Sequence, residues 1–311
     1  MRTAHALGWR ANVAQALMAP IEHPSLWLLG TLSFMMRGGL VVMLLPIIVL
    51  PTQVEVRLML GGNLGSSGFA PAFWVGVGAA TIFSTGLLML VLYTLARLDV
   101  STFERLATDP DLELELPPRR AADPDARIRD LFVVESLMVI VLLLAAVPLA
   151  AALGQVTYDE ILRPTSTAPI YDRVFSQVIL PLAVLAISLP IVDSISAGAV
   201  RRLLIGRSVG SAVAESIGDL VRRPVWFFAT TAVAWLALAA AVVGTDAVLT
   251  VAWQQTRAAF LRTTSFSDML TAVAPLFVAL LLAGVFMSGV ALCGYVAAFR
   301  NALWTVTNLR R

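Results

Sequence analysis

Three charged side chains lie inside apolar stretches, and they are the groups of this sequence best able to do chemistry within a membrane. Arg37 lies near the middle of the first stretch, Glu135 about one turn into the third, and Asp193 near the end of the fourth. An arginine at the bilayer centre costs at least about 2.5–3.5 kcal/mol unless it finds a partner or reaches the interface. We predict that Arg37 pairs with Asp193, and that Glu135 is a shallower alternative partner.

Two roles for this pair stay open. It is either an ion pair that fixes the register of two helices, or part of a gated or proton-linked transport site. Pro181 and Pro190 precede Asp193 in the same stretch and predict a kink beside the charge. Transporters use such breaks, but prolines are frequent in membrane helices generally. Snorkelling of Arg37 to water or lipid is the third alternative.

Motifs typical of catalysis are missing from the sequence. It contains no glycine-rich phosphate loop, no His/Glu metal motif and no Gly-x-Ser-x-Gly elbow. The one cysteine, Cys293, offers no disulfide framework, and the two histidines, His5 and His23, both precede the first apolar stretch. We therefore expect no enzymatic activity, no metal site and no cofactor.

Long apolar stretches must position these groups. The chain is 59% hydrophobic and 14% charged, whereas soluble domains carry roughly 45–50% apolar and about 25% charged residues. A hydrocarbon core about 30 Å thick needs about 20 helical residues, and each stretch is that long. We predict an all-α fold, a polytopic membrane bundle forming a single membrane domain over residues 1–311. Its six transmembrane helices are expected over residues 26–51, 72–96, 131–153, 174–200, 225–243 and 269–299.

Arginines outside these spans indicate the orientation. They concentrate in the N-terminus, in 97–130, in 201–223 and in the C-terminus. By the positive-inside rule both termini are cytoplasmic, in a multi-pass protein of the bacterial inner membrane. Anionic lipid headgroups are expected to contact five arginines of the 201–223 segment: Arg201, Arg202, Arg207, Arg222 and Arg223.

Two cytoplasmic elements are expected between the spans. Residues 98–130 form an acidic, proline-rich linker whose Ser-Thr-Phe-Glu stretch at 101–104 matches a capping box. Residues 208–221 form an amphipathic surface helix, because Val209, Val213 and Ile217 recur at helical spacing. Each element is either a solvated or lipid-bound segment without further function or a docking surface for a partner.

A faint repeat relates two parts of the chain. Residues 12–27 align without gaps on residues 212–227, and Pro24 matches Pro224. The first two and last two spans are therefore possible counterparts, each pair preceded by a surface helix and a proline. Low-complexity apolar sequence aligns easily, so duplication stays a hypothesis. If it is real, it resembles the parallel repeats of some transporters.

Two segments carry a resemblance to a known group. They are Ser-Ala-Gly-Ala-Val-Arg-Arg-Leu-Leu-Ile-Gly-Arg at 196–207, continuing to Arg-Arg-Pro-Val-Trp at 222–226, and Tyr-Val-Ala-Ala-Phe-Arg-Asn-Ala-Leu-Trp at 295–304. They resemble bacterial six-helix proteins similar to the membrane domain fused to some glycerophosphodiester phosphodiesterases. The resemblance implies a six-helix membrane fold. It implies no settled activity, and no catalytic residue is carried over.

These patterns lead to two functional hypotheses. The leading one is a non-catalytic membrane subunit or scaffold that works with a partner protein or as a homo-oligomer, without nucleic acid. The alternative is a permease-like transport component that uses the region of Arg37 and Asp193. An intramembrane enzyme acting on lipid is the weakest hypothesis, since no reactive constellation supports it.

Overall fold

Helices account for almost all of the computed structural model, which describes residues 8–47, 64–65, 68–108, 112, 114, 124–162, 170–262 and 269–309. In these ranges the only strands are β1 (Leu64–Gly65) and β2 (Gly68–Phe69), a short antiparallel pair. The all-α class is confirmed. The helices are α1 (Trp9–Glu22), α2 (Ser25–Phe34), the π-helical turn η1 (Met35–Gly39), α3 (Leu40–Leu44), α5 (Pro71–Ala107), α6 (Pro124–Leu162), α7 (Ile170–Leu204), α8 (Val209–Arg222), α9 (Pro224–Arg262) and α10 (Met269–Leu309).

Six helical segments are long and apolar enough to cross a membrane, with mean hydropathies between 1.5 and 2.7. The first comprises α2, η1 and α3 together, and the others lie in α5, α6, α7, α9 and α10. Each predicted span has its counterpart, so by length and composition the chain is a multi-pass membrane protein. Residues 48–51 of the first predicted span lie outside the described residues.

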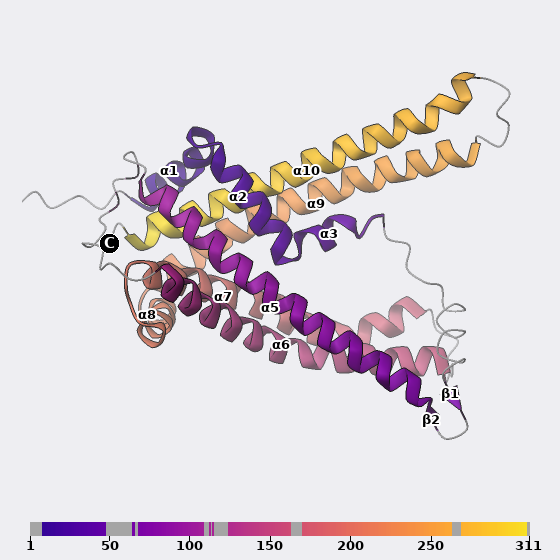
Figure 1. Ribbon diagram of the computed structural model, residues 1–311, viewed down its shortest axis with the longest axis horizontal. Helices are drawn as coiled ribbons and strands as arrows, with labels where there is room; N and C mark the ends of the chain where they lie inside the picture. Colours follow the sequence, from indigo (N-terminus) through magenta and orange to yellow (C-terminus); the bar gives the residue numbers. More distant parts are fainter. Residues whose placement is uncertain are drawn as a thin grey trace, which may run out of the picture.

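The spans form two groups that diverge from a common end (Figure 1). Helices α5, α6 and α7 make one group, and α9 and α10 make the other. Helix α2 packs mainly against α10, and the short helices α1 and α8 lie at the end where the two groups meet. The C-terminus lies at this same end.

Glycines allow the close approach of α2 and α10. A Cβ atom on Gly294 would lie 1.9 Å from Oγ1 of Thr31, and a Cβ atom on Gly30 would lie 2.2 Å from the carbonyl oxygen of Gly294. Both distances are shorter than any real contact. Small residues at such a crossing let two backbones touch, which is how membrane helices gain packing energy.

The linker predicted over residues 98–130 is much shorter than expected. Helix α5 continues to Ala107 and α6 already begins at Pro124. The hydroxyl of Ser101 does not cap a new helix, because it donates to the carbonyl of Arg97 at 3.0 Å within α5. Buried Phe103 and Leu106 continue the apolar helical spacing of the span, and this explains why the helix does not end. Most of the acidic tract at 108–126 lies outside the described residues.

Helix α8 occupies the position predicted for the surface helix, shifted by one residue. Ser208 is its N-cap, with the side chain accepting from the backbone N–H of Ser211. The hydroxyl of Ser216 donates to the carbonyl of Ile195 on α7 at 2.8 Å. A Cβ atom on Gly198 would lie 2.5 Å from that hydroxyl. Helix α8 is therefore seated tightly on the end of α7.

The aligned segments 12–27 and 212–227 adopt similar local structures. Helices α1 and α8 each contain 14 residues, and Pro24 and Pro224 stand at the start of the helix that follows each. Helix α1 packs on α10, whereas α8 packs on α7. This match agrees with a duplication, which stays a hypothesis.

Substitution of Gly294 tests the α2–α10 crossing. We expect Gly294→Val to lower the free energy of unfolding by about 1–3 kcal/mol, because the added methyl groups must separate the two backbones. Thermal unfolding of the purified protein in detergent measures the effect. Gly284→Val is the matched control, because a Cβ atom at that position of α10 meets nothing within 4 Å. Equal melting temperatures for the two variants would contradict the close crossing.

Candidate functional site

The first membrane span is interrupted where it carries its charge. Arg37 (φ −79°, ψ 17°) and Gly38 (φ 91°, ψ 2°) depart from helical geometry inside η1. The left-handed conformation of Gly38 favours glycine, since it has no Cβ atom. At about 1.5 Å per residue, Arg37 lies roughly 18 Å from the start of α2 and thus near the middle of the span. Such breaks occur at membrane depth where the backbone faces protein or a cavity.

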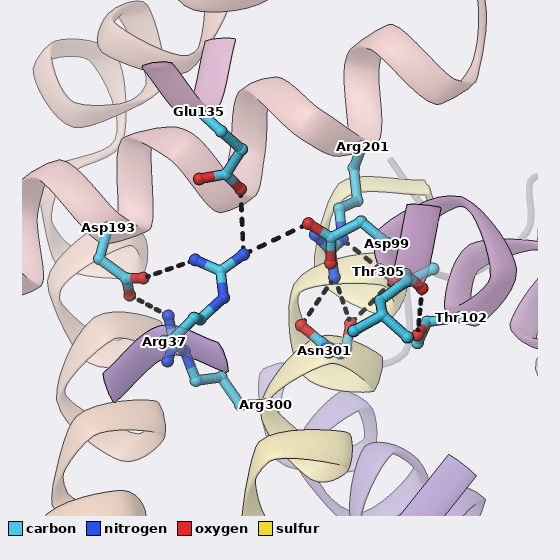
Figure 2. Close-up of polar contacts among 10 residues, drawn as sticks. Arg37, Asp99, Thr102, Glu135, Asp193, Arg201, Arg300, Asn301 and Thr305 are labelled. Carbon is cyan, nitrogen blue, oxygen red and sulfur yellow. Dashed lines mark hydrogen bonds and ion pairs between the residues drawn. The ribbon is translucent and has the colours of Figure 1, made fainter. Parts of the chain in front are cut away.

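Arg37 contacts three carboxylates from three different helices (Figure 2). Its Nη2 atom donates to Oε1 of Glu135 on α6 at 3.0 Å and to Oδ2 of Asp99 on α5 at 3.3 Å. Its Nη1 atom lies 3.8 Å from Oδ1 of Asp193 on α7. The structure thus brings Arg37 to both acids considered from the sequence and adds a third.

Asp193 connects this cluster to the second group of helices. Its Oδ2 atom accepts from Arg300 on α10 and, at 3.1 Å, from Nε1 of Trp235 on α9. The guanidinium of Arg300 also lies 5.6 Å from the centroid of the Trp235 ring, which is a cation–π distance. One carboxylate therefore has partners on η1, α9 and α10.

The lipid-headgroup contacts expected for Arg201 and Arg202 are wrong. Arg201 is 4% exposed, and its Nη2 atom donates to Oδ1 of Asn301 on α10 at 3.0 Å. Arg202 is 9% exposed and pairs with Asp219 and Glu215 of α8. Both arginines face inward because α8 and α10 cover the end of α7 on which they lie. The sequence does not show that α8 and α10 cover this end of α7.

The other three arginines of that segment have a different environment. Arg207 is exposed, and its Nε atom lies 3.5 Å from Oε1 of Glu215. Arg222 and Arg223 at the end of α8 are both exposed. For these three arginines, the predicted contact with lipid headgroups stays a prediction.

The cluster of charged side chains around Arg37 is balanced in formal charge. Three arginines face three carboxylates, and a balanced set is the arrangement in which ionised groups are tolerated in hydrocarbon. Figure 2 shows the contacts, with Arg37 in the middle and Asn301, Thr305 and Thr102 to one side. The six residues, listed by formal charge, are Arg37, Arg201, Arg300, Asp99, Glu135 and Asp193.

A cavity of about 520 Å³ lies beside the cluster, and residues from all six spans line it. Arg37, Glu135, Asp193, Arg201 and Arg300 form its charged part. Most of the remaining wall is apolar and comes from α3, α5, α6, α7 and α9. Small-molecule sites of proteins typically have this size and this combination of an apolar wall with a few polar groups.

Two members of the cluster, Asp99 and Arg300, were not predicted as site residues from the sequence. Asp99 was assigned to the linker, and Arg300 lies one residue beyond the predicted end of the last span. The charge of Arg97 ends the second apolar run before Asp99, and Arg300 itself ends the last one. The signal that points to Asp99 is the apolar spacing from Leu95 through Phe103 to Leu106, which places the acid on a continuing helix.

Comparisons with protein-family models, with curated proteins and with solved structures find no match to this chain. The resemblance to the membrane domain of glycerophosphodiester phosphodiesterases therefore stays a prediction. Among the residues that the structure describes, no set of three or more His, Cys, Asp and Glu side chains is arranged to hold a metal ion. The site must be interpreted from its own geometry.

Removal of the central charge tests the cluster. We expect Arg37→Leu to destabilise the protein by about 3–5 kcal/mol, because it leaves buried carboxylates without their partner. Arg257→Leu is the control, since Arg257 is an exposed arginine and surface substitutions usually change stability by about 0.5 kcal/mol or less. Unfolding in detergent micelles measures both.

The triple variant Arg37→Leu/Asp99→Asn/Glu135→Gln separates charge compensation from simple packing. We expect it to recover part of the lost stability, because it removes the unpaired charges together with the arginine. If the triple variant is less stable than Arg37→Leu alone, charge compensation is not what holds these helices together.

Proposed function

We propose that this protein is a permease-like transport component of the bacterial cytoplasmic membrane, with the cavity beside Arg37 as its substrate site. One observation carries the proposal. The Arg37 side chain is 29% exposed and lines a cavity of about 520 Å³, although it lies near the middle of a membrane-spanning segment. Ionisable groups in such positions mark substrate or ion pathways by default.

An ion pair that only fixed helix register would not need this cavity. Asp99 and Glu135 are almost fully buried, at 2% and 5% exposure, as expected for structural partners. Arg37 is far more exposed than either. The arginine is thus held by buried acids on one side and faces open space on the other, which is the arrangement of a binding site.

The arrangement of the helices supports the same proposal. Helices α5, α6 and α7 pack on one another, and α2 and α9 each pack on α10, with fewer contacts between the two groups. Charged contacts cross the seam, from Arg37 to three acids and from Arg300 to Asp193. Many transporters work by rocking one bundle against another around a site at mid-membrane, next to an interrupted helix.

The scaffold role expected first from the sequence has less support. Glu215 and Asp219 on α8 already pair with Arg202 of the same chain, so they are engaged within the protein. The acidic tract at 108–126 lies largely outside the described residues. A partner protein or a homo-oligomer remains part of the proposal, because transport components often work in assemblies.

The orientation is also part of the proposal. Both termini are placed in the cytoplasm on the distribution of arginines. Where α8 ends and α9 begins, Val221 and Val225 are 75% and 78% exposed beside Arg222 and Arg223. Exposed apolar side chains next to arginines suit the boundary between hydrocarbon and anionic headgroups.

Cysteine labelling tests transport without knowledge of the substrate. The chain has one cysteine, so Cys293→Ala provides a cysteine-free background. We expect Ser196→Cys, in the cavity, to react with a membrane-impermeant thiol reagent from both faces of the membrane, because alternating access opens the site to each side in turn. Right-side-out and inside-out vesicles provide the two measurements.

Gly210→Cys is the matched control on α8, where a Cβ atom meets nothing within 4 Å. It should react only from the cytoplasmic face, and reaction from the other face would overturn the proposed orientation. Reaction of Ser196→Cys from a single face, or from neither, would contradict alternating access.

A further inference from the structure

We propose that Glu135 binds the proton that drives transport, and that its protonation weakens the contact between the two groups of helices. The proton comes from water on one side of the membrane, bonds to Oε2 of Glu135 and leaves to water on the other side. The carboxylate becomes neutral in the first step and is ionised again in the second. This inference rests on the proposed function and deepens it by naming the ion that is coupled to transport.

Glu135 shares the donor that it uses with a second acid. Among the described residues its one hydrogen bond comes from Nη2 of Arg37 at 3.0 Å, and the same nitrogen atom donates to Asp99 at 3.3 Å (Figure 2). An Nη atom of arginine carries two N–H donors, so both are used. The second oxygen of Glu135, Oε2, has no hydrogen bond in the part of the chain that the structure describes. It can therefore bond a proton without giving up a contact of its own.

Asp193 is held in its ionised form by more donors than Glu135. It accepts from Arg300 on α10 and from Trp235 on α9. Its Oδ1 atom also lies 3.8 Å from Nη1 of Arg37. Protonation of Asp193 would remove a charge that faces two guanidinium groups, whereas Glu135 contacts one. A proton is therefore taken up at Glu135 with less loss of ion pairing.

Asp99 is separated from the cavity. Glu135 lines the cavity of about 520 Å³, whereas Asp99 is not among its lining residues and has a side chain that is 2% exposed. Arg201 also acts on Asp99 as a second positive charge. Of the three acids, Glu135 is thus the one that combines a place in the cavity wall with a single partner among the described residues.

Burial and charge act on Glu135 in opposite directions. The charged groups of neighbouring elements that act on its carboxyl are Arg37 on η1, Asp99 on α5, and Asp193 and Arg201 on α7. Glu215 and Asp219 of α8 pair with Arg202 of α7 instead, and Arg129 of α6 pairs with Asp130. Burial and nearby acids favour the neutral form of a carboxyl, whereas arginines favour the ionised form. Opposing influences of this kind allow one group both to bind and to release a proton.

The cavity favours a proton over a metal ion. A metal cation needs several ligands, but in the described ranges no three His, Cys, Asp and Glu side chains are arranged to hold one. The two carboxylates of the wall, Glu135 and Asp193, both face the guanidinium of Arg37. The guanidinium already occupies the place of a cation between them. A proton needs a single oxygen atom.

Protonation of Glu135 acts on the seam between the two groups. Glu135 belongs to α6, whereas Arg37 belongs to the first span, whose helix α2 packs mainly on α10. The neutral carboxyl can still accept a hydrogen bond, but its ionic attraction to Arg37 is lost, so one charged contact across the seam weakens. This contact lies at the interruption of the first span, at Arg37 and Gly38. The proton thereby shifts the balance between the two arrangements that alternating access requires.

Infrared spectroscopy of the full-length protein tests proton binding. Exposed carboxyl groups stay ionised between about pH 8 and about pH 6, so a protonated-carboxyl band that grows over this range reports a buried acid. We expect this band in the unmodified protein, and we expect Glu135→Gln to remove it. The amide oxygen of the variant can still accept from Arg37, and thermal unfolding confirms that the variant is folded. Absence of the band from the unmodified protein, or its persistence in Glu135→Gln, would overturn the inference.

Asp246→Asn is the matched control for the infrared measurement. Asp246 lies in the span of α9, and its Oδ1 atom is buried without a partner in the described residues, but it does not line the cavity. We expect this variant to keep the part of the band that Glu135→Gln removes. A band that is lost in Asp246→Asn and kept in Glu135→Gln would assign the proton to the wrong acid for this inference.

The labelling experiment shows whether the proton is coupled to movement. For Ser196→Cys in the Cys293→Ala background, the ratio of the reaction rates from the two faces should change at least about tenfold between about pH 8 and about pH 6. That factor corresponds to the weakening of one hydrogen bond between charged groups. Because the same thiol reacts from both faces, the pH dependence of its own reactivity cancels in the ratio. With Glu135→Gln added, the ratio should stay at its low-pH value throughout. A ratio that follows the sodium concentration at constant pH would identify a metal cation instead and contradict the proton.

These outcomes separate the inference from the proposed function. Reaction from both faces with a ratio that does not depend on pH would support transport and contradict coupling through Glu135. Reaction from a single face at every pH would contradict transport, whereas an infrared band that Glu135→Gln removes would still assign proton binding to Glu135.

Discussion

A guanidinium group in hydrocarbon is stable only where negative charge surrounds it, and this requirement constrains most of the structure. Asp99, Glu135 and Asp193 must approach Arg37 from three different helices. Each of these acids in turn needs positive charge, so the depth of every charge-bearing helix is fixed relative to the others. The extension of α5 to Ala107, which buried Phe103 and Leu106 support, keeps Asp99 on a helix within reach of Arg37.

Two kinds of interaction hold the helices, and they act in different places. Within each group of helices the contacts are apolar, and at the crossing of α2 and α10 they depend on Gly30 and Gly294. Between the groups the contacts include charges and hydrogen bonds. Dispersion contacts do not depend on charge, whereas the contacts of Arg37 and Arg300 with carboxylates do. Interactions that depend on charge thus lie mainly at the seam between the two groups.

The sequence predicts the spans well because hydropathy over some 20 residues depends little on packing. It also predicts that Arg37 approaches Asp193 or Glu135, since depth and side-chain direction follow from the orientation of a helix. The rotation of a helix about its own axis cannot be predicted in this way, because the neighbouring helices determine it. Arg201 and Arg202 illustrate this limit: adjacent in sequence, they face α10 and α8 respectively, and neither faces lipid. The break at Gly38 is a further limit, because adjacent glycines such as Gly38 and Gly39 are frequent in membrane helices and do not by themselves indicate an interruption.

The length of the last two helices has a consequence for the surrounding bilayer. Helices α9 and α10 contain 39 and 41 residues, which is about 60 Å at 1.5 Å per residue and about twice the thickness of a hydrocarbon core. Tilt alone does not match helices of this length to the membrane, because membrane helices tilt by at most about 40°. One or both ends of this hairpin therefore extend beyond the hydrocarbon core, into the headgroups or water.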